Sequence, residues 1–491
     1  MESQHRHFLD RFNQFLTLEG EPPLMVAPDA RLPADFSQRV ADAFDQMHLN
    51  QHDNAFNAAR KQATRESERT RNACMADFYE AIATLLEAEH APYTIVGNSI
   101  AMDAVDAADH RSRLWKRVVH REAGGELRAT LEPVDHIDFS RRPVICFGGN
   151  NGNNLSHPSL MHTMKNAEQA LGGFDIYNED SGCDDIDIYI IGHPACHRAR
   201  SNTESFRFNA NPEGYSVSWV RESFSRYFKP FIEDAIAKDS AHTLAPLKAA
   251  ARKLNFFSNS FGSCCIKSVR NEMAALLHER GYSNAEIKEV FTEVCAVMVD
   301  ASALLDYTPP EGNFSAVYVL SRNDRFVRAR SDYQRFVDPD TLTRFPAIRP
   351  LPHSDNELLV IVDAPVRGVV WNPVEMARDQ EAGKPPRAAE IQPRGWVATD
   401  RSGHNLSLSN SRIAEISDEP IVRYSSPDLT EYALRNALQR PDHLGDVASL
   451  LTKTQLTPPR HPLGTGRFIH ASHAETEAIR RQAGNDNGKG A

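Results

Sequence analysis

The sequence contains no disulfide framework. Its seven cysteines are spread over 491 residues, no two stand in CxxC spacing, and only Cys264 and Cys265 are adjacent. A sparse, odd-numbered set in a long chain is typical of reduced thiols and not of a disulfide scaffold or a zinc site. We therefore expect neither a structural metal nor a cofactor held by thiolates.

The chain also lacks a long apolar run, an export signal and an excess of positive charge. No segment approaches the ~18 apolar residues that span a bilayer, and the N-terminal stretch MESQHRHFLDRF has no apolar signal region. The formal net charge is -11, from 55 basic and 66 acidic residues, which argues against a nucleic-acid partner. We expect a soluble, cytoplasmic protein with no transmembrane segment; non-Sec export is the alternative.

The first ninety residues show helical periodicity. Apolar side chains recur at three- and four-residue spacing in PADFSQRVADAFDQM and in RTRNACMADFYEAIATLLEAEH. We predict a helical N-terminal extension over 1–90 and a main domain over 91–450. Residues 451–491 are rich in proline, glycine and polar side chains, which predicts a disordered tail.

Short apolar runs alternate with amphipathic ones in the main domain. A hairpin is predicted around Gly124 and Gly125. Strands are then predicted within RPVICF, DDIDIYIIG, KLNFF, FSAVYVL and ELLVIV, with helices between them, whereas CAVMVDASAL is either a strand or a helix end. This alternation predicts an α/β fold with a mostly parallel sheet, helices on both faces, and insertions near 194–215 and 372–395. Ligands of such sheets bind beyond the carboxyl ends of the strands.

The stretch LNFFSNSFG, residues 254–262, places small side chains on alternate positions between a predicted strand and a predicted helix. A sharp turn there would hold Ser260 in a strained conformation at a helix N-terminus, where the dipole favours developing negative charge. Strand and helix would then be so close that the positions two before and two after it must be small, and Ser258 and Gly262 are. The alternative is an ordinary helix start with Ser258 or Ser260 as N-cap.

Ser-Asn-Ser-Phe-Gly resembles the nucleophile elbow, G-x-S-x-G, of the α/β-hydrolase superfamily, with serine in place of the first glycine. The resemblance covers about residues 110–440. It implies that Ser260 is a nucleophile and that the backbone amide of Phe261 helps to stabilise an oxyanion.

The loop FGGN, residues 147–150, follows an earlier predicted strand and resembles the oxyanion loop of the same superfamily. The resemblance implies that the amide of Asn150 is the second oxyanion donor and that Gly148 and Gly149 permit a close approach. A flexible Gly/Asn turn is the alternative. A phosphate-binding loop is less favoured, because the spacing fits neither glycine-rich phosphate motif.

The superfamily activates its nucleophile with an acid and a histidine, which complete a catalytic triad. Two further strand ends supply candidates for these two residues. NDRFV follows the strand FSAVYVL, and the resemblance implies that Asp324 is the acid. SGHN follows the last predicted strand, and the resemblance implies that His404 is the base. The order serine, acid, histidine is that of the superfamily. Weaker candidates are Asp306 and Asp332 for the acid and His353 for the base, with His193 near the pocket mouth.

The sequence thus predicts a serine hydrolase that cleaves an ester, thioester or amide through an acyl-enzyme on Ser260, with a small-molecule or lipid-like acyl substrate. A carboxylic ester is the favoured substrate class, and no cofactor is expected. The alternatives are a non-catalytic binding protein of the same fold and an acyltransferase that uses the same triad.

Two other clusters have plainer interpretations. Asp184, Asp185 and Asp187 stand at the entry of a strand, where alternate side chains point to opposite faces, so a charged strand entry is favoured over a divalent-cation site. Cys264 and Cys265 follow the elbow, where a helix N-terminus could activate a thiolate. Because a serine occupies the nucleophile position, we expect both thiols to be buried packing residues.

Overall fold

The computed structural model describes part of the chain. The described stretches are 63–89, 112–121, 127–149, 186–192, 198–321, 347–351 and 356–362, with isolated positions between 9 and 23, at 163 and 167, and between 330 and 354. All statements below concern these residues.

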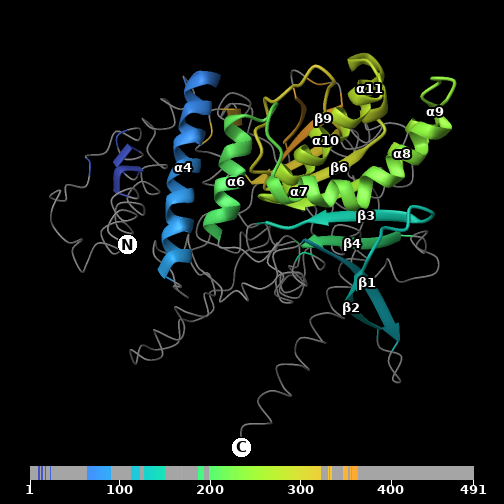
Figure 1. Ribbon diagram of the computed structural model, residues 1–491, viewed down its shortest axis with the longest axis horizontal. Coiled ribbons are helices and arrows are strands. Elements are labelled where there is room, and N and C mark those ends of the chain that lie inside the picture. The colour runs from blue at the N-terminus through green and yellow to red at the C-terminus, as the bar shows by residue number, and fades with distance from the viewer. Residues whose placement is uncertain are drawn as a thin grey trace, which may run out of the picture.

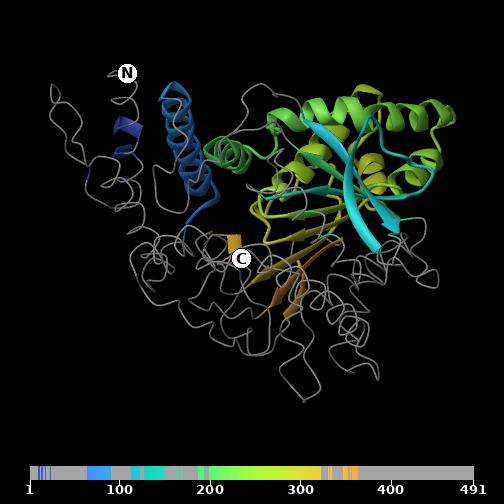
Figure 2. The same cartoon turned by 90° about the horizontal axis from the view of Figure 1, so that it is seen from below.

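The described strands form one nine-stranded sheet in the order β2-β1-β4-β3-β5-β6-β7-β9-β8. The β1–β2 hairpin lies at one end of the sheet, and the orange strands β8 and β9 lie at the other (Figure 2). The strand bounds are β1 Arg113–Arg121, β2 Leu127–Val134, β3 Arg142–Phe147, β4 Ile186–Gly192, β5 Asn255–Asn259, β6 Cys295–Val299, β7 Ser315–Ser321, β8 Ala347–Pro350 and β9 Glu357–Val362.

The centre of the sheet is parallel. Strands β4, β3, β5, β6, β7 and β9 pair in parallel with their neighbours, whereas β1 pairs antiparallel with β2 and β4, and β8 pairs antiparallel with β9. The predicted α/β class and mostly parallel sheet are therefore confirmed. The parallel strands bring the loops after β3, β5 and β6 to one edge.

Helices connect the strands where the periodicity predicts them (Figure 1). Ser283 caps α11 and forms a capping box with Glu286, as the Ser-Asn-Ala-Glu sequence indicates. A π-helical turn over Phe224–Phe228 joins α7 to α8. The helix bounds are α4 Arg65–Glu89, α6 Arg198–Ala210, α7 Ser218–Ser223, α8 Lys229–Lys238, α9 Ala245–Ala251, α10 Gly262–Glu279 and α11 Asn284–Phe291.

Helix α10 is the main contact between the helices and the sheet. It packs on β3, β5 and β6 and also touches α6, α7 and α11. Thirteen of its 18 residues are buried, so apolar side chains surround most of it. Beneath it, Phe256 in β5 is fully buried and contacts the rings of Phe147, Phe228 and Phe314. This aromatic core holds β5 and the start of α10 in fixed positions.

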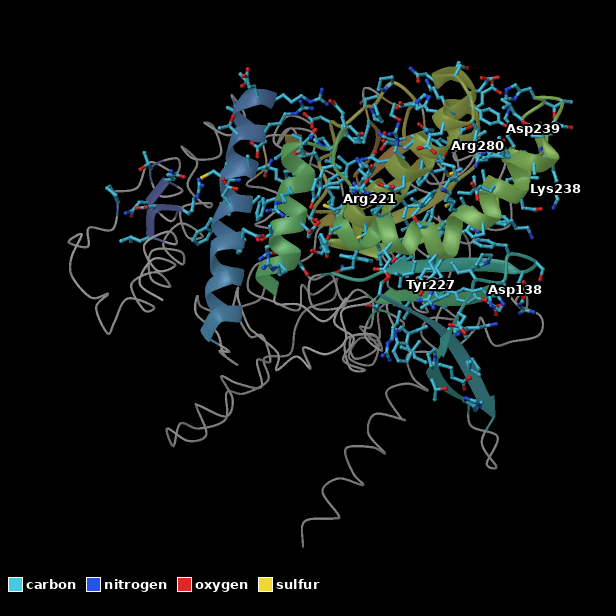
Figure 3. All side chains as sticks on the ribbon, viewed as in Figure 1. Asp138, Arg221, Tyr227, Lys238, Asp239 and Arg280 are labelled. Atoms are coloured by element: carbon cyan, nitrogen blue, oxygen red, sulfur yellow. The ribbon has the colours of Figure 1, made fainter. Side chains whose placement is uncertain are left out.

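The corner between α8 and α9 is closed by Asp239, which lies at the end of α8 (Figure 3). Its carboxylate accepts hydrogen bonds from the amides of Thr243 and Leu244 and from the hydroxyl of Tyr282. These bonds outweigh burial and lower the pKa of Asp239.

Helix α4 of the N-terminal extension packs along α6, and both views show the blue and green helices side by side (Figure 1). The ring of Tyr79 stacks on Phe206, and Glu80 forms ion pairs with Arg200 and Arg207. Arg65, at the start of α4, donates to the carbonyl of Asp306 in the loop after β6.

Three described elements escaped the sequence interpretation, namely β8, α6 and the seven-residue helix α9. Strand β8 is only four residues long, and α6 lies within a segment that the sequence indicates as an insertion. Helix α6 is rich in polar side chains, and its Arg200 and Arg207 form ion pairs with Glu80 of α4. The helix predicted in PADFSQRVADAFDQM, the insertion at 372–395, the last predicted strand and the tail lie outside the described residues. No described helix is long and apolar enough to cross a membrane.

Candidate active site at the turn after strand β5

Ser260 lies between β5 and α10 in the conformation that the elbow motif requires. Its φ angle is +50°, in the left-handed region that non-glycine residues seldom adopt. Its amide donates to the carbonyl of Val299 in β6 at 2.8 Å. The residue is 8% exposed, which distinguishes it from Ser258, which is fully buried. Such strain at a strand-to-helix turn is typical of functional sites.

The carbonyl of Ser260 accepts hydrogen bonds from two different elements. It accepts hydrogen bonds from the amide of Ser263 at 3.1 Å, from the Ser263 hydroxyl at 2.7 Å, and from the amide of Ser302 at 3.3 Å. Ser263 belongs to α10 and Ser302 to the loop after β6, so helix and loop together hold the strained turn in place. A side chain on such a turn is pre-organised.

Gly262 is where α10 crosses the end of β3. A methyl group added to it would lie 2.2 Å from the carbonyl oxygen of Phe147 and 2.9 Å from that of Gly148. No side chain fits at these distances from backbone atoms. The sequence argument that this position must be small is confirmed, and the reason is the close contact of α10 with β3.

The loop after β3 reaches Ser260. A methyl group added to Gly149 would lie 3.3 Å from Cβ of Ser260 and 3.0 Å from Oδ1 of Asn259. The structure thus brings Gly148, Gly149 and the elbow together, as the resemblance implies. Phe261 is the N-cap residue of α10, with φ -54° and ψ -30°. Asn150 lies outside the described residues, so the oxyanion donors stay a prediction.

Ser258 stands where the superfamily motif has glycine. It pairs with Phe147 on one side and with Met298 on the other, and it is fully buried. Its hydroxyl makes no hydrogen bond within the described part of the chain. Ser258 therefore acts as a small packing residue, and its hydroxyl contributes nothing visible to the turn.

The other predicted triad members, Asp324 and His404, lie outside the described residues, as do His193 and His353. Their roles stay predictions. Of the weaker acid candidates, Asp306 is partly exposed and Asp332 is fully buried.

Asp332 has a structural task. Its Oδ1 accepts from Nε of Arg330 at 2.9 Å, and its Oδ2 accepts from Arg330 and from the amide of Leu305 at 2.6 Å. Burial acts to raise the pKa of Asp332, but the charge and hydrogen bonds of Arg330 lower it. Arg330 in turn donates to the carbonyls of Ala301 and Ala303. The pair therefore holds the loop after β6, and Asp332 is not available as a triad acid.

A second buried cation holds the same loop. Nζ of Lys267 in α10 donates to the carbonyl of Leu304 at 2.8 Å and lies over the rings of Tyr307 and Tyr318. Burial lowers the pKa of Lys267. Glu357 in β9, buried beside it, accepts from Tyr318 at 2.6 Å.

Asp300 is a further residue at the carboxyl edge of the sheet, and no role was predicted for it. It follows β6 directly, is fully buried, and has a φ angle of +49°. Its amide donates to the carbonyl of Val319 in β7 at 2.8 Å. The available signal was an aspartate immediately after the apolar run CAVMV, the position that parallel sheets use for chemistry.

The packing interpretation of the two cysteines is confirmed, whereas Asp184 and Asp185 lie outside the described residues and the charged strand entry stays a prediction. Cys264 and Cys265 are fully buried, and burial raises the pKa of both thiols, so neither is an activated thiolate. Asp187 is paired with Lys116 at 2.8 Å and with Arg141 at 3.0 Å. The described residues contain no group of three side chains arranged to hold a metal ion.

Comparisons with known proteins identify no family for this chain. No protein-family model matches the sequence, and no curated protein is significantly similar to it.

Proposed function

We propose that the protein is a serine hydrolase that forms an acyl-enzyme on Ser260. The observation that carries the proposal is the backbone of Ser260, whose positive φ angle is maintained by hydrogen bonds to β6, α10 and the loop after β6. A strained serine at the end of a parallel strand, crossed by a glycine of the following helix, is the geometry that exposes a nucleophilic hydroxyl. An ordinary N-cap would not require a left-handed residue.

The proposed reaction uses residues from four strand ends. His404 takes the proton of the Ser260 hydroxyl as Oγ forms a bond to the substrate carbonyl carbon. The amides of Phe261 and Asn150 stabilise the oxyanion. When this tetrahedral intermediate collapses, the bond from the carbonyl carbon to the alcohol, thiol or amine breaks. That group leaves with the proton from His404. Water then attacks the acyl-enzyme, gives a proton to His404, and releases the acid and the Ser260 hydroxyl. The resemblance to the α/β-hydrolase superfamily implies that the carboxylate of Asp324 orients His404.

The resemblance to the α/β-hydrolase superfamily supports a carboxylic ester as the substrate, with a small-molecule or lipid-like acyl group. A panel of p-nitrophenyl esters of increasing chain length tests this preference. A maximum at long chains would support a lipid-like substrate, whereas activity confined to acetate would contradict it. The proposed cytoplasmic location rests on the sequence.

A fluorophosphonate probe tests the nucleophile, because it reacts with activated serines. The wild-type protein is expected to be labelled and Ser260→Ala to remain unlabelled. Ser258→Ala is the matched control, since it removes a hydroxyl two residues earlier on the same strand and should label like the wild type. An unlabelled wild type, or equal labelling of Ser260→Ala, would contradict the proposal and favour a non-catalytic binding protein. Products formed with an added alcohol separate acyl transfer from hydrolysis.

A further inference from the structure

We propose that Asp300, rather than Asp324, is the carboxylate that positions the catalytic histidine. This inference rests on the proposed function, because it concerns the histidine that activates Ser260. Asp300 acts through that histidine and is therefore a positioning residue.

The first argument is the place of Asp300 beside the nucleophile. Strands β5 and β6 pair in parallel with Asn259 opposite Val299, so Ser260 and Asp300 are the next residues on neighbouring strands. Neighbouring strands lie about 4.8 Å apart. The amide of Ser302, two residues after Asp300, donates to the carbonyl of Ser260 at 3.3 Å. A histidine that bridges the two side chains needs one hydrogen bond of about 2.6–3.2 Å to each.

The second argument is the shared backbone conformation. Ser260 and Asp300 have φ angles of +50° and +49°, and each donates its amide at 2.8 Å to a carbonyl of the next strand. Aspartate tolerates the left-handed region better than most residues, but it is still an uncommon conformation. Strained residues of this kind gather at active sites, where the surrounding structure maintains them.

The third argument is burial. Asp300 is fully withdrawn from solvent at the carboxyl edge of the sheet. A buried carboxylate is stable only when donors or a positive charge compensate it. Charges interact strongly where water is excluded, so a carboxylate in this position would stabilise the imidazolium that forms when histidine takes the serine proton.

The fourth argument is the rigidity of the loop that follows Asp300. Side chains from α6, α10 and beyond β7 bind its backbone groups one after another. Arg330 binds the carbonyls of Ala301 and Ala303, and Lys267 binds that of Leu304. The other bonds are from Asn209 Nδ2 to Ser302 O, from Ala303 N to Ser263 Oγ, from Leu304 N to Asn209 Oδ1, and from Leu305 N to Asp332 Oδ2.

This loop therefore holds Asp300 in one position, as a residue that orients a catalytic base must be held. Among the described residues, the charged side chains of Arg330, Asp332 and Lys267 bind the backbone of residues 301–305. Asp332, a buried rival, already accepts hydrogen bonds on both carboxylate oxygens from Arg330 and Leu305.

The test compares Asp300→Asn with Asp324→Asn. Asparagine keeps the size of the side chain and tolerates a positive φ, so the backbone should be preserved. Asp300→Gly is the second variant, because glycine adopts this φ without strain. For each variant we would measure the rate of fluorophosphonate labelling, kcat/KM for an activated ester as a function of pH, and thermal unfolding.

Both Asp300 variants are expected to lose about 10²–10⁴-fold in kcat/KM at pH 7, and Asp324→Asn is expected to lose clearly less than either of them. The acidic limb of the pH profile should move to lower pH in the Asp300 variants, because loss of the carboxylate destabilises the imidazolium and lowers the histidine pKa. A purely structural residue would not move this limb.

Three results would overturn the inference. Folded Asp300 variants with wild-type rates and an unchanged pH profile would contradict it, as would the same losses in Asp324→Asn. Failure of both Asp300 variants to fold would show a structural role for the residue. A wild type that is not labelled at Ser260 is a different outcome, because it overturns the proposed function, and this inference with it.

Discussion

Ser260 and Asp300 are related by the same local geometry on adjacent strands. Each follows its strand directly, each has a φ angle near +50°, and each donates its amide to the next strand in the sheet, Ser260 to Val299 and Asp300 to Val319. The parallel sheet thus repeats one strained turn at two neighbouring strand ends. A hydroxyl and a carboxylate come to the same edge of the sheet as a result.

The strain at Ser260 predicts an inverted order of stability for two variants. Alanine is usually more stable than glycine within a regular element by about 0.5–1 kcal/mol. At φ +50° alanine keeps the strain of a side chain and glycine does not. We expect Ser260→Gly to be at least as stable to urea as Ser260→Ala. If Ser260→Ala were clearly more stable to urea than Ser260→Gly, the turn would not be strained in solution.

Gly262→Ala should be among the most destabilising substitutions in α10. Its methyl group would lie 2.2 Å from the carbonyl oxygen of Phe147, and overpacking against backbone costs about 1–3 kcal/mol or more. Gly281→Ala is the control, because nothing lies within 4 Å of its methyl position and its φ of +89° alone opposes the change. Equal urea midpoints for the two variants would contradict the close contact between α10 and β3.

Ser258→Ala should leave stability unchanged or raise it by up to about 1 kcal/mol, because it removes a buried hydroxyl that has no hydrogen-bond partner in the described structure. Ser263→Ala is the matched variant. The Ser263 hydroxyl donates to the carbonyl of Ser260 and accepts from the amide of Ala303, so its loss should cost about 1–3 kcal/mol. The difference is measurable by urea unfolding. A large loss in Ser258→Ala would show that its hydroxyl is bound.

Glu311 should make stability depend on acid pH. Burial acts to raise its pKa, but hydrogen bonds from Arg270 at 2.7 Å and His278 at 2.8 Å hold the pKa at about 2. Because the folded pKa lies below the unfolded one, of about 4.3, the stabilisation is present above pH ~5. It is lost as the pH falls toward about 2.

Glu311→Gln should therefore be less stable than the wild type at pH 7, by roughly 1–3 kcal/mol. This difference in the free energy of unfolding should disappear as the pH falls from about 5 to about 2. Urea unfolding across this range measures it. Glu233→Gln is the control: its pair with Arg280 is more exposed, and loss of such a pair costs about 0–1 kcal/mol. A pH-independent gap for Glu311→Gln would contradict the depressed pKa.

Local chemistry in the sequence was sufficient to predict most of the described elements. Alternating apolar runs indicated β3, β4, β5, β7 and β9, and the Ser283–Glu286 capping box marked the start of α11. The short strand β8 and the polar helix α6 were not predictable in this way. Strand β8 pairs with β9, α6 packs along α4, and the short helix α9 was likewise not predicted.

The candidate site also has features that the local sequence predicts and features that depend on the tertiary structure. The small residues of SNSFG predicted the sharp turn at Ser260, because steric exclusion around a strand-to-helix crossing depends on the residues themselves. The sequence could not show that Gly149 lies against Ser260, that Asp332 is bound by Arg330, or that Asp300 shares the strained turn. Those facts depend on which strands are neighbours and in what register, and only the packing of the whole sheet decides that.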